Sequence, residues 1–171
     1  MAVSVTVRPA TASDVDGALA VFEAVVDEGA WMGTEPGFDP VERRERFAAS
    51  VGAEGRAFLV AADAGAVVGM LVMEVAPFGV AGMGMCVAPG WRRRGVGGAL
   101  LAGAIAAARR LGAHKIGLEV WPHNEAAIRL YQRHGFVVEG RRRRHYRRRD
   151  GELWDSVMMG LVLDDDEGAP A

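Results

Sequence analysis

Residues 87–98, Val-Ala-Pro-Gly-Trp-Arg-Arg-Arg-Gly-Val-Gly-Gly, constrain the fold of this chain more than any other segment. The apolar residues before Val87 predict a strand, and the apolar period that starts at Val96 predicts a helix. The first turn of a helix offers backbone N–H groups and a partial positive charge. Glycine lets a bulky anion approach the backbone, and arginine adds planar, charged donors that match phosphate oxygens. This strand-to-helix junction therefore predicts a pyrophosphate-binding site.

Length and composition predict one globular domain. The chain has 171 residues, half of them apolar and a quarter charged, which is typical of a soluble protein. We assign residues 1–163 to this domain and expect the acidic tail, 164–171, to be disordered. The chain lacks an apolar run of membrane-spanning length and a recognisable signal peptide, which predicts a cytoplasmic protein without a membrane partner.

The single cysteine, Cys86, excludes an internal disulfide, and its apolar neighbours favour a core thiol over a nucleophile. No pair of Cys/His clusters has zinc spacing, so we expect no metal site.

Strand and helix signals alternate along the chain and end in a hairpin, which predicts an α/β fold with a mixed sheet. A final strand after Glu152 is expected to lie exposed, which would allow a homodimer. Strands are expected at 3–8, 57–62, 67–75, 80–87, 115–121, 136–148 and 152–163, and helices at 11–27, from 39 onward, at 96–111 and at 124–135.

Two signatures, in the right order, resemble the GNAT family of acetyl-CoA-dependent N-acetyltransferases. Residues 92–97 match the family's phosphate-binding pattern of Arg or Gln, two free positions, Gly, one free position and Gly or Ala. Residues 124–136 resemble the family's next helix, and the order of elements matches over residues 3–163. The segment 146–152, with Asp155 and Met159, places the chain closest to YhhY-like and phosphinothricin-type acetyltransferases of small amines and amino acids.

The resemblance implies a single-domain fold of the α/β (α+β) class, with a mixed, mostly antiparallel sheet of about seven strands and about four helices. It implies an acyltransferase that moves an acetyl group from acetyl-CoA to a primary amine of a free amino acid or other small molecule. A protein N-terminus or a ribosomal protein is the alternative acceptor. A CoA- or RNA-binding module without catalysis is the alternative of another class, and Tyr131 argues against it.

The resemblance also assigns residues to the cofactor. The pantetheine arm would pair with backbone where two strands splay apart, and the pyrophosphate would sit on the amides of residues 92–99. Arg92 and Arg94 are the expected side-chain contacts, and Arg93, where many relatives carry glycine, should leave the backbone cradle undisturbed if its side chain points to solvent. The expected cofactor residues are Cys86, Val87, Arg92, Arg93, Arg94, Gly95, Val96, Gly97, Gly98, Ala99 and Asn124.

Tyr131 and Glu119 are the expected catalytic residues. In the family the tyrosine protonates the departing thiolate, and a phenol with a pKa of ~10 can do so. Glu119 would take the amine proton if it lies on the buried face of its strand, and a solvent-facing position is the equal alternative. His123 and Glu74 are weaker candidates for the base.

The acceptor would meet the loop that holds Trp31, Met32 and Glu35, and also Tyr146. Glu35 would receive an ammonium group, although ordinary loop packing explains these residues equally well. Residues 92–149 carry 15 of the 20 basic residues and 3 acidic ones, which suggests a face for a polyanion. In a strand, however, the seven arginines of residues 141–149 alternate between two faces. We therefore expect solvated arginines with one or two contacts to an acceptor carboxylate, and no nucleic acid.

Overall fold

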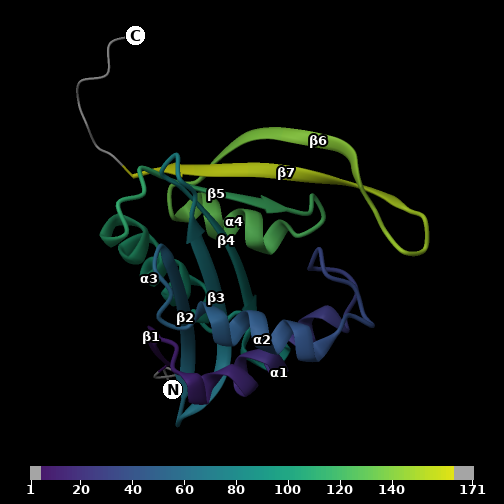
Figure 1. The fold of residues 1–171 in the computed structure, drawn as a ribbon. Helices are drawn as coiled ribbons and strands as arrows, with labels where there is room; N and C mark the ends of the chain where they lie inside the picture. The colour runs from purple at the N-terminus through teal and green to yellow at the C-terminus, as the bar shows by residue number, and fades with distance from the viewer. Residues whose placement is uncertain (1–4, 164–171) are drawn as a thin grey trace, which may run out of the picture.

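The computed structural model describes residues 5–163, which form a seven-stranded sheet in the order β1-β2-β3-β4-β5-β7-β6 (Figure 1). Neighbouring strands are antiparallel except for β4 and β5, which are parallel, so the predicted mixed, mostly antiparallel sheet is confirmed. The expected disordered tail lies outside the described residues. The strands are β1 (Thr6–Pro9), β2 (Arg56–Asp63), β3 (Ala66–Val75), β4 (Val80–Val87), β5 (Lys115–Val120), β6 (Val137–Arg147) and β7 (Leu153–Val162).

Four helices flank the sheet, as predicted, and each begins where its sequence favours it. Asp39 accepts hydrogen bonds from the amides of Val41 and Glu42 at the start of α2, with proline at the first helical position. The predicted capping box of Thr11 and Asp14 is present ahead of α1. The helices are α1 (Val15–Val26), α2 (Pro40–Ser50), α3 (Val96–Arg110) and α4 (Glu125–Arg133), with 3-10 turns at Ala12–Asp14 and Pro89–Trp91.

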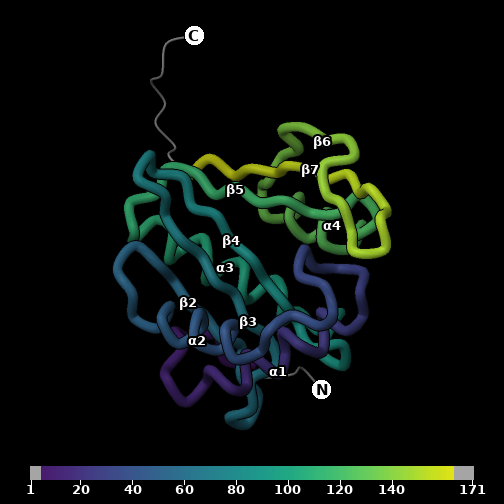
Figure 2. The backbone as a smooth tube through the Cα atoms, turned by 45° about the vertical axis from the view of Figure 1, so that its right-hand side comes forward, coloured from purple at the N-terminus to yellow at the C-terminus, as the bar shows by residue number. Residues whose placement is uncertain are grey.

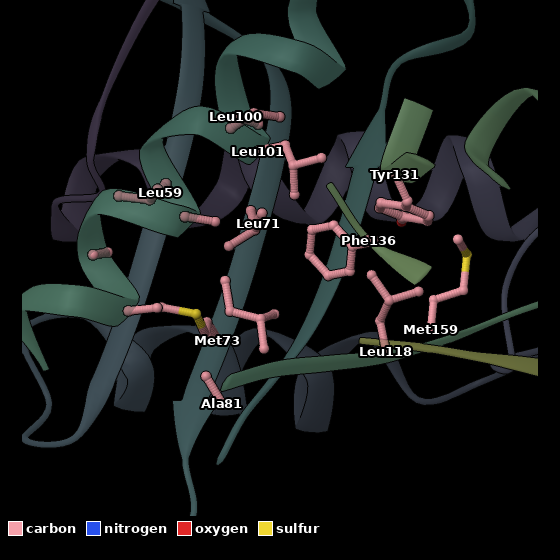
Figure 3. Packing of buried hydrophobic residues seen from close by; sticks show 14 of the residues in the cluster. Leu59, Leu71, Met73, Ala81, Leu100, Leu101, Leu118, Tyr131, Phe136 and Met159 are labelled. Atoms are coloured by element: carbon pink, nitrogen blue, oxygen red, sulfur yellow. The ribbon is translucent and has the colours of Figure 1, made fainter. Parts of the chain in front are cut away.

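The helices cover the two faces of the sheet and create two apolar cores. Helices α1 and α2 pack on one face, where Phe22 and Phe47 meet edge to face. Helices α3 and α4 pack on the other, around Leu71, Leu100 and Ile116. Figure 3 shows part of this second core, in which the ring of Tyr131 lies beside that of Phe136. Among residues 5–163, no helix has the length and apolarity needed to cross a membrane.

The strand after Glu152 is β7, and it lies inside the sheet, whereas β6 forms the edge. Our expectation of an exposed final strand was therefore wrong. Strand β7 returns between β5 and β6 and pairs with β5 from Val157 to Val162. The two strands differ in a way that suits these places: β7 buries Ser156 and Met159, whereas β6 is polar and exposed along most of its length. Charged side chains protect an edge strand from pairing with other chains.

Strands β4 and β5 diverge, and this divergence positions the candidate site. Their paired residues run from Val80–Lys115 to Gly82–Gly117, but β4 continues to Val87 and β5 to Val120. The far ends of the two strands therefore separate, as the resemblance implied. Backbone groups of β4 beyond Gly82 are thereby available to a ligand that lies between the strands.

Candidate active site

A cavity of about 640 Å³ lies where β4 and β5 separate. The C-terminal end of β4, the start of α3 and one side of α4 line one part of it. The ends of β5 and β6 and the loop after α1 line the other part. The fold brings twelve of the predicted residues together in the lining of this cavity. They are Cys86, Val87, Arg92, Arg93, Gly95, Gly97, Gly98, Glu119, Asn124, Tyr131, Trp31 and Tyr146.

The start of α3 presents backbone amides to the cavity. Gly95 precedes the helix with φ of 84°, a left-handed conformation that favours glycine. The amides of Val96, Gly97 and Gly98 then precede the first internal bond of the helix, in which Ala99 N donates to the Gly95 oxygen at 3.0 Å. The Ala99 amide, which we expected to bind the pyrophosphate, therefore donates its hydrogen bond within the helix. The Val96 side chain is buried in the core, so its backbone alone can face a ligand.

The three arginines of the junction differ in where they point. Arg92 lines the cavity and pairs with Glu28, with 2.9 Å between Nη1 and Oε2. Arg93 also lines the cavity, and its φ is 61°. Arg94 was expected to contact phosphate, but it is absent from the described cavity lining and stacks 5.2 Å above the ring of Trp91. Arg92 and Arg93 thus supply positive charge from the junction, and Arg133 of α4 also lines the cavity.

Tyr131 and Cys86 lie on the two sides of the cavity, on α4 and β4. Burial raises the pKa of the Cys86 thiol to about 12, so this thiol stays protonated and the expectation of a core thiol is confirmed. Burial also raises the pKa of Tyr131 to about 12, and the nearby Cys86 adds to the shift. The phenol is therefore protonated near neutral pH and can donate a proton. Asn124 caps α4 by accepting from the amide of Ala127.

Glu119 lies on the opposite face of β5 from the buried Leu118 and Val120, so of the two equal alternatives the structure has the outward-facing one. Its side chain is 31% exposed and is held by three donors. Arg142 and Ser156 donate to it at 2.7 Å, and the Tyr146 hydroxyl donates at 3.0 Å. Burial, followed by this hydrogen bond, raises the pKa of Tyr146. The result is a fixed carboxylate at the wall of the cavity.

The roof loop, residues 29–36, supplies part of the cavity lining and is hydrogen-bonded to the β6–β7 hairpin, beneath which it lies in Figure 2. Trp31, Met32 and Gly33 line the cavity from this loop. Glu35, which we expected to receive an ammonium group, is absent from the described lining, and its carboxylate accepts from the Arg149 amide. It is used to hold the loop in place.

Sequence reasoning missed two residues at this end. Trp121 directly follows β5 and packs edge to face on Tyr146, with 5.0 Å between ring centroids, and it lines the cavity. Arg148 is buried and donates to carbonyl groups of the roof loop. The sequence offered no signal for Arg148, because it is one of seven arginines in nine residues. Among residues 5–163, no group of three or more His, Cys, Asp or Glu side chains is placed to hold a metal ion.

Comparisons with known proteins agree with this geometry. The model of the acetyltransferase (GNAT) family matches residues 23–136. The L-amino acid N-acetyltransferase AaaT of Escherichia coli (strain K12) is 37% identical over 109 residues, which cover 61% of this chain and 67% of that protein.

Two solved structures show how closely the fold is shared. The ribosomal-protein-alanine N-acetyltransferase of Brucella melitensis is 27% identical, with a TM-score of 0.83 over 92% of this chain and 99% of that one. A phosphinothricin acetyltransferase of Sinorhizobium meliloti in complex with acetyl-CoA is 22% identical, with a TM-score of 0.84 over 98% of this chain and 94% of that one. At that identity the second likeness shows the fold alone.

Proposed function

This chain belongs to the GNAT family of acetyltransferases and uses acetyl-CoA as its acetyl donor, and we propose that its acceptor is the α-amino group of a free amino acid or another small amine. The relative that is 37% identical bears the name of an L-amino acid N-acetyltransferase, which supports this acceptor class. The proposal assigns the start of α3 to the cofactor pyrophosphate and the roofed end of the cavity to the acceptor.

The observation that carries the proposal is the loop tied across the acceptor end of the cavity. The roof loop is joined to the β6–β7 hairpin by hydrogen bonds from Arg148 to Met32 and Gly33 and from Arg149 to Glu35. The cavity keeps an opening to solvent through which a small molecule can enter, whereas a protein N-terminus needs a longer groove along which its chain can leave. The Glu119 carboxylate lines this end and, although it pairs with Arg142, offers an oxygen to the amine of a small acceptor.

The chain's own groups suit a direct transfer. The neutral amine attacks the thioester carbonyl, a C–N bond forms and the C–S bond breaks without a covalent enzyme intermediate. Glu119, directly or through water, takes the proton that the amine loses, and the Tyr131 hydroxyl gives a proton to the departing sulfur. A backbone N–H near Val87 stabilises the developing oxyanion. Most of the rate comes from holding the two reactants together, and an α-amino group loses its proton more readily than a lysine side chain does.

The test is thiol release from acetyl-CoA across free amino acids, polyamines and short peptides, with Tyr131→Phe as the control. We expect turnover with one or more free amino acids or small amines, and strong loss of it in the variant. Turnover with peptides alone would replace this acceptor class with a protein N-terminus. Binding of acetyl-CoA without turnover of any acceptor would contradict the proposed acceptor class.

A further inference from the structure

We infer that Arg148 is a positioning residue, whose buried guanidinium holds the roof loop over the acceptor end of the cavity. The inference rests on the proposed function, because it takes the roofed end to be the place of the acceptor. Arg148 directly follows β6 and is 5% exposed, whereas Arg147 and Arg149 on either side are exposed. An arginine is rarely buried unless its charge is paired and its N–H groups are hydrogen-bonded.

The guanidinium of Arg148 binds the backbone of the roof loop at three points. Its Nη1 donates to the carbonyl oxygens of Met32 at 3.1 Å and Gly33 at 3.4 Å, and its Nη2 donates to that of Gly29 at 3.4 Å. Met32 and Gly33 line the cavity. The planar fork of an arginine can bind several oxygens at fixed angles, which the point charge of a lysine cannot do. The shape of this wall therefore depends on Arg148.

Two further contacts fix the guanidinium itself. The Nε atom of Arg148 lies 3.7 Å from Oε2 of Glu35, which neutralises the buried charge from within the same loop. The guanidinium also stacks on the ring of Trp154 in β7, 4.3 Å from its centroid. Because Trp154 belongs to the sheet, the loop takes its position from the sheet through Arg148.

The roof loop has other contacts, which differ from those of Arg148 in burial or in the atoms they reach. The Arg149 side chain reaches the Pro36 oxygen, and His123 Nε2 lies 2.7 Å from the Ala30 oxygen, but both of those side chains are on the exposed surface or its margin. Two part-buried contacts, from Cys86 Sγ to Met32 Sδ at 3.7 Å and from Arg43 to the Thr34 hydroxyl at 3.3 Å, end on side chains of the loop. Among the hydrogen bonds of residues 5–163, those of Arg148 join a buried side chain to the backbone of two cavity-lining residues.

The experiment compares Arg148→Lys and Arg148→Met with Arg147→Met, a matched control at the neighbouring exposed arginine. The full-length protein is assayed with varied amino acid and with varied acetyl-CoA. We expect Arg148→Lys to raise the KM for the amino acid roughly tenfold, because a small misplacement of the acceptor costs much of its binding. The KM for acetyl-CoA should stay unchanged, and Arg147→Met should behave as wild type. An unchanged amino-acid KM in Arg148→Lys, or an equal rise in both KM values, overturns the inference.

Limited cleavage by chymotrypsin after Trp31 gives a readout that needs no acceptor. Arg148→Lys should be cut faster there than the wild type and Arg147→Met, with unchanged acetyl-CoA affinity. If the wild type acetylates no amino acid, the proposed function fails and this readout decides the inference alone. Equal cleavage rates in all three proteins overturn it. The lysine variant keeps the charge, so the test stands even if Arg148→Met does not fold.

Discussion

Arg92 and Glu28 form an ion pair that joins the start of α3 to the end of α1, with 2.9 Å between Nη1 and Oε2. The same Glu28 oxygen accepts a hydrogen bond from the indole of Trp31 in the roof loop. Arg92 lines the cofactor end of the cavity, and Trp31 lines the acceptor end. One carboxylate therefore contacts residues of both ends of the site.

Replacing Glu28 with glutamine should tighten binding of acetyl-CoA. The pyrophosphate must compete with the Glu28 carboxylate for the Arg92 guanidinium, and a neutral amide removes that competition while keeping an oxygen for Trp31. Because partly exposed ion pairs contribute about 0–1 kcal/mol, we expect the Kd to fall by up to about fivefold. Calorimetric titration with acetyl-CoA measures it, and a higher Kd in Glu28→Gln would mean that Glu28 orients Arg92 instead.

Replacing Gly95 with valine should weaken binding of acetyl-CoA, and Gly65→Val is the matched control. Both glycines have a left-handed φ, 84° and 87°, and neither would place a Cβ within 4 Å of another group. Both variants therefore carry similar backbone strain, of order 1–3 kcal/mol. Gly95 adjoins the helix-opening amides, whereas Gly65 lies in the β2–β3 turn. If the two variants bind acetyl-CoA equally well, the proposed phosphate cradle is wrong.

The local parts of this fold could be predicted because local chemistry decides them. Asp39-Pro40, the Thr11–Asp14 capping box and the glycines of the junction each carry their own signal for a turn or a helix start. The strand order could not be read in the same way. A hairpin signal joins β6 to β7, but which of them pairs with β5 depends on contacts far apart in the sequence.

In the candidate site, too, the residues that belong to short local motifs could be predicted, and those that depend on distant contacts could not. Gly95, Gly97 and Tyr131 belong to short motifs, so the sequence placed them correctly at the cavity. The face of Glu119 stayed open between two alternatives, because a strand shows alternation but not which face is buried. The role of Arg148 depends on a loop more than a hundred residues earlier in the chain, and its neighbours in sequence are also arginines.

Replacing Tyr131 with phenylalanine should lower kcat about 10²-fold or more, as expected for loss of a general acid. The affinity for acetyl-CoA should stay nearly unchanged, because the ring still packs against Phe136. Steady-state rates with calorimetric Kd values for acetyl-CoA measure the two effects separately. Equal losses in turnover and affinity would point to a role for Tyr131 in packing rather than proton transfer.

The rate should rise with pH and then reach a plateau. Burial raises the pKa of Tyr131 to about 12, so the phenol keeps its proton across the range in which enzymes are assayed. The acidic limb should instead follow the acceptor amine, which must lose a proton before it attacks. A profile of kcat/KM from pH ~6 to ~10, a range that lies below the raised pKa of Tyr131, measures it. A fall in rate above pH ~9 would contradict protonated Tyr131 as the acid.

Asp14 should stabilise the fold at neutral pH but not in acid. Arg8 donates to both of its oxygens, at 2.7 and 2.8 Å, and together with the Thr11 amide and hydroxyl holds the pKa of this buried carboxyl well below its usual value. A lowered folded-state pKa adds stability above the unfolded value of ~3.9 and loses it as pH falls below that.

Asp14→Asn should therefore lower the free energy of unfolding by about 2 kcal/mol at pH 7, and by much less near pH ~3. Urea unfolding at the two pH values measures the difference. Asp16→Asn is the control, because the pair of Asp16 with Arg44 is largely exposed and should contribute little at either pH. A loss for Asp14→Asn that is as large near pH ~3 as at pH 7 would show that shape and capping, rather than the charge, make Asp14 important.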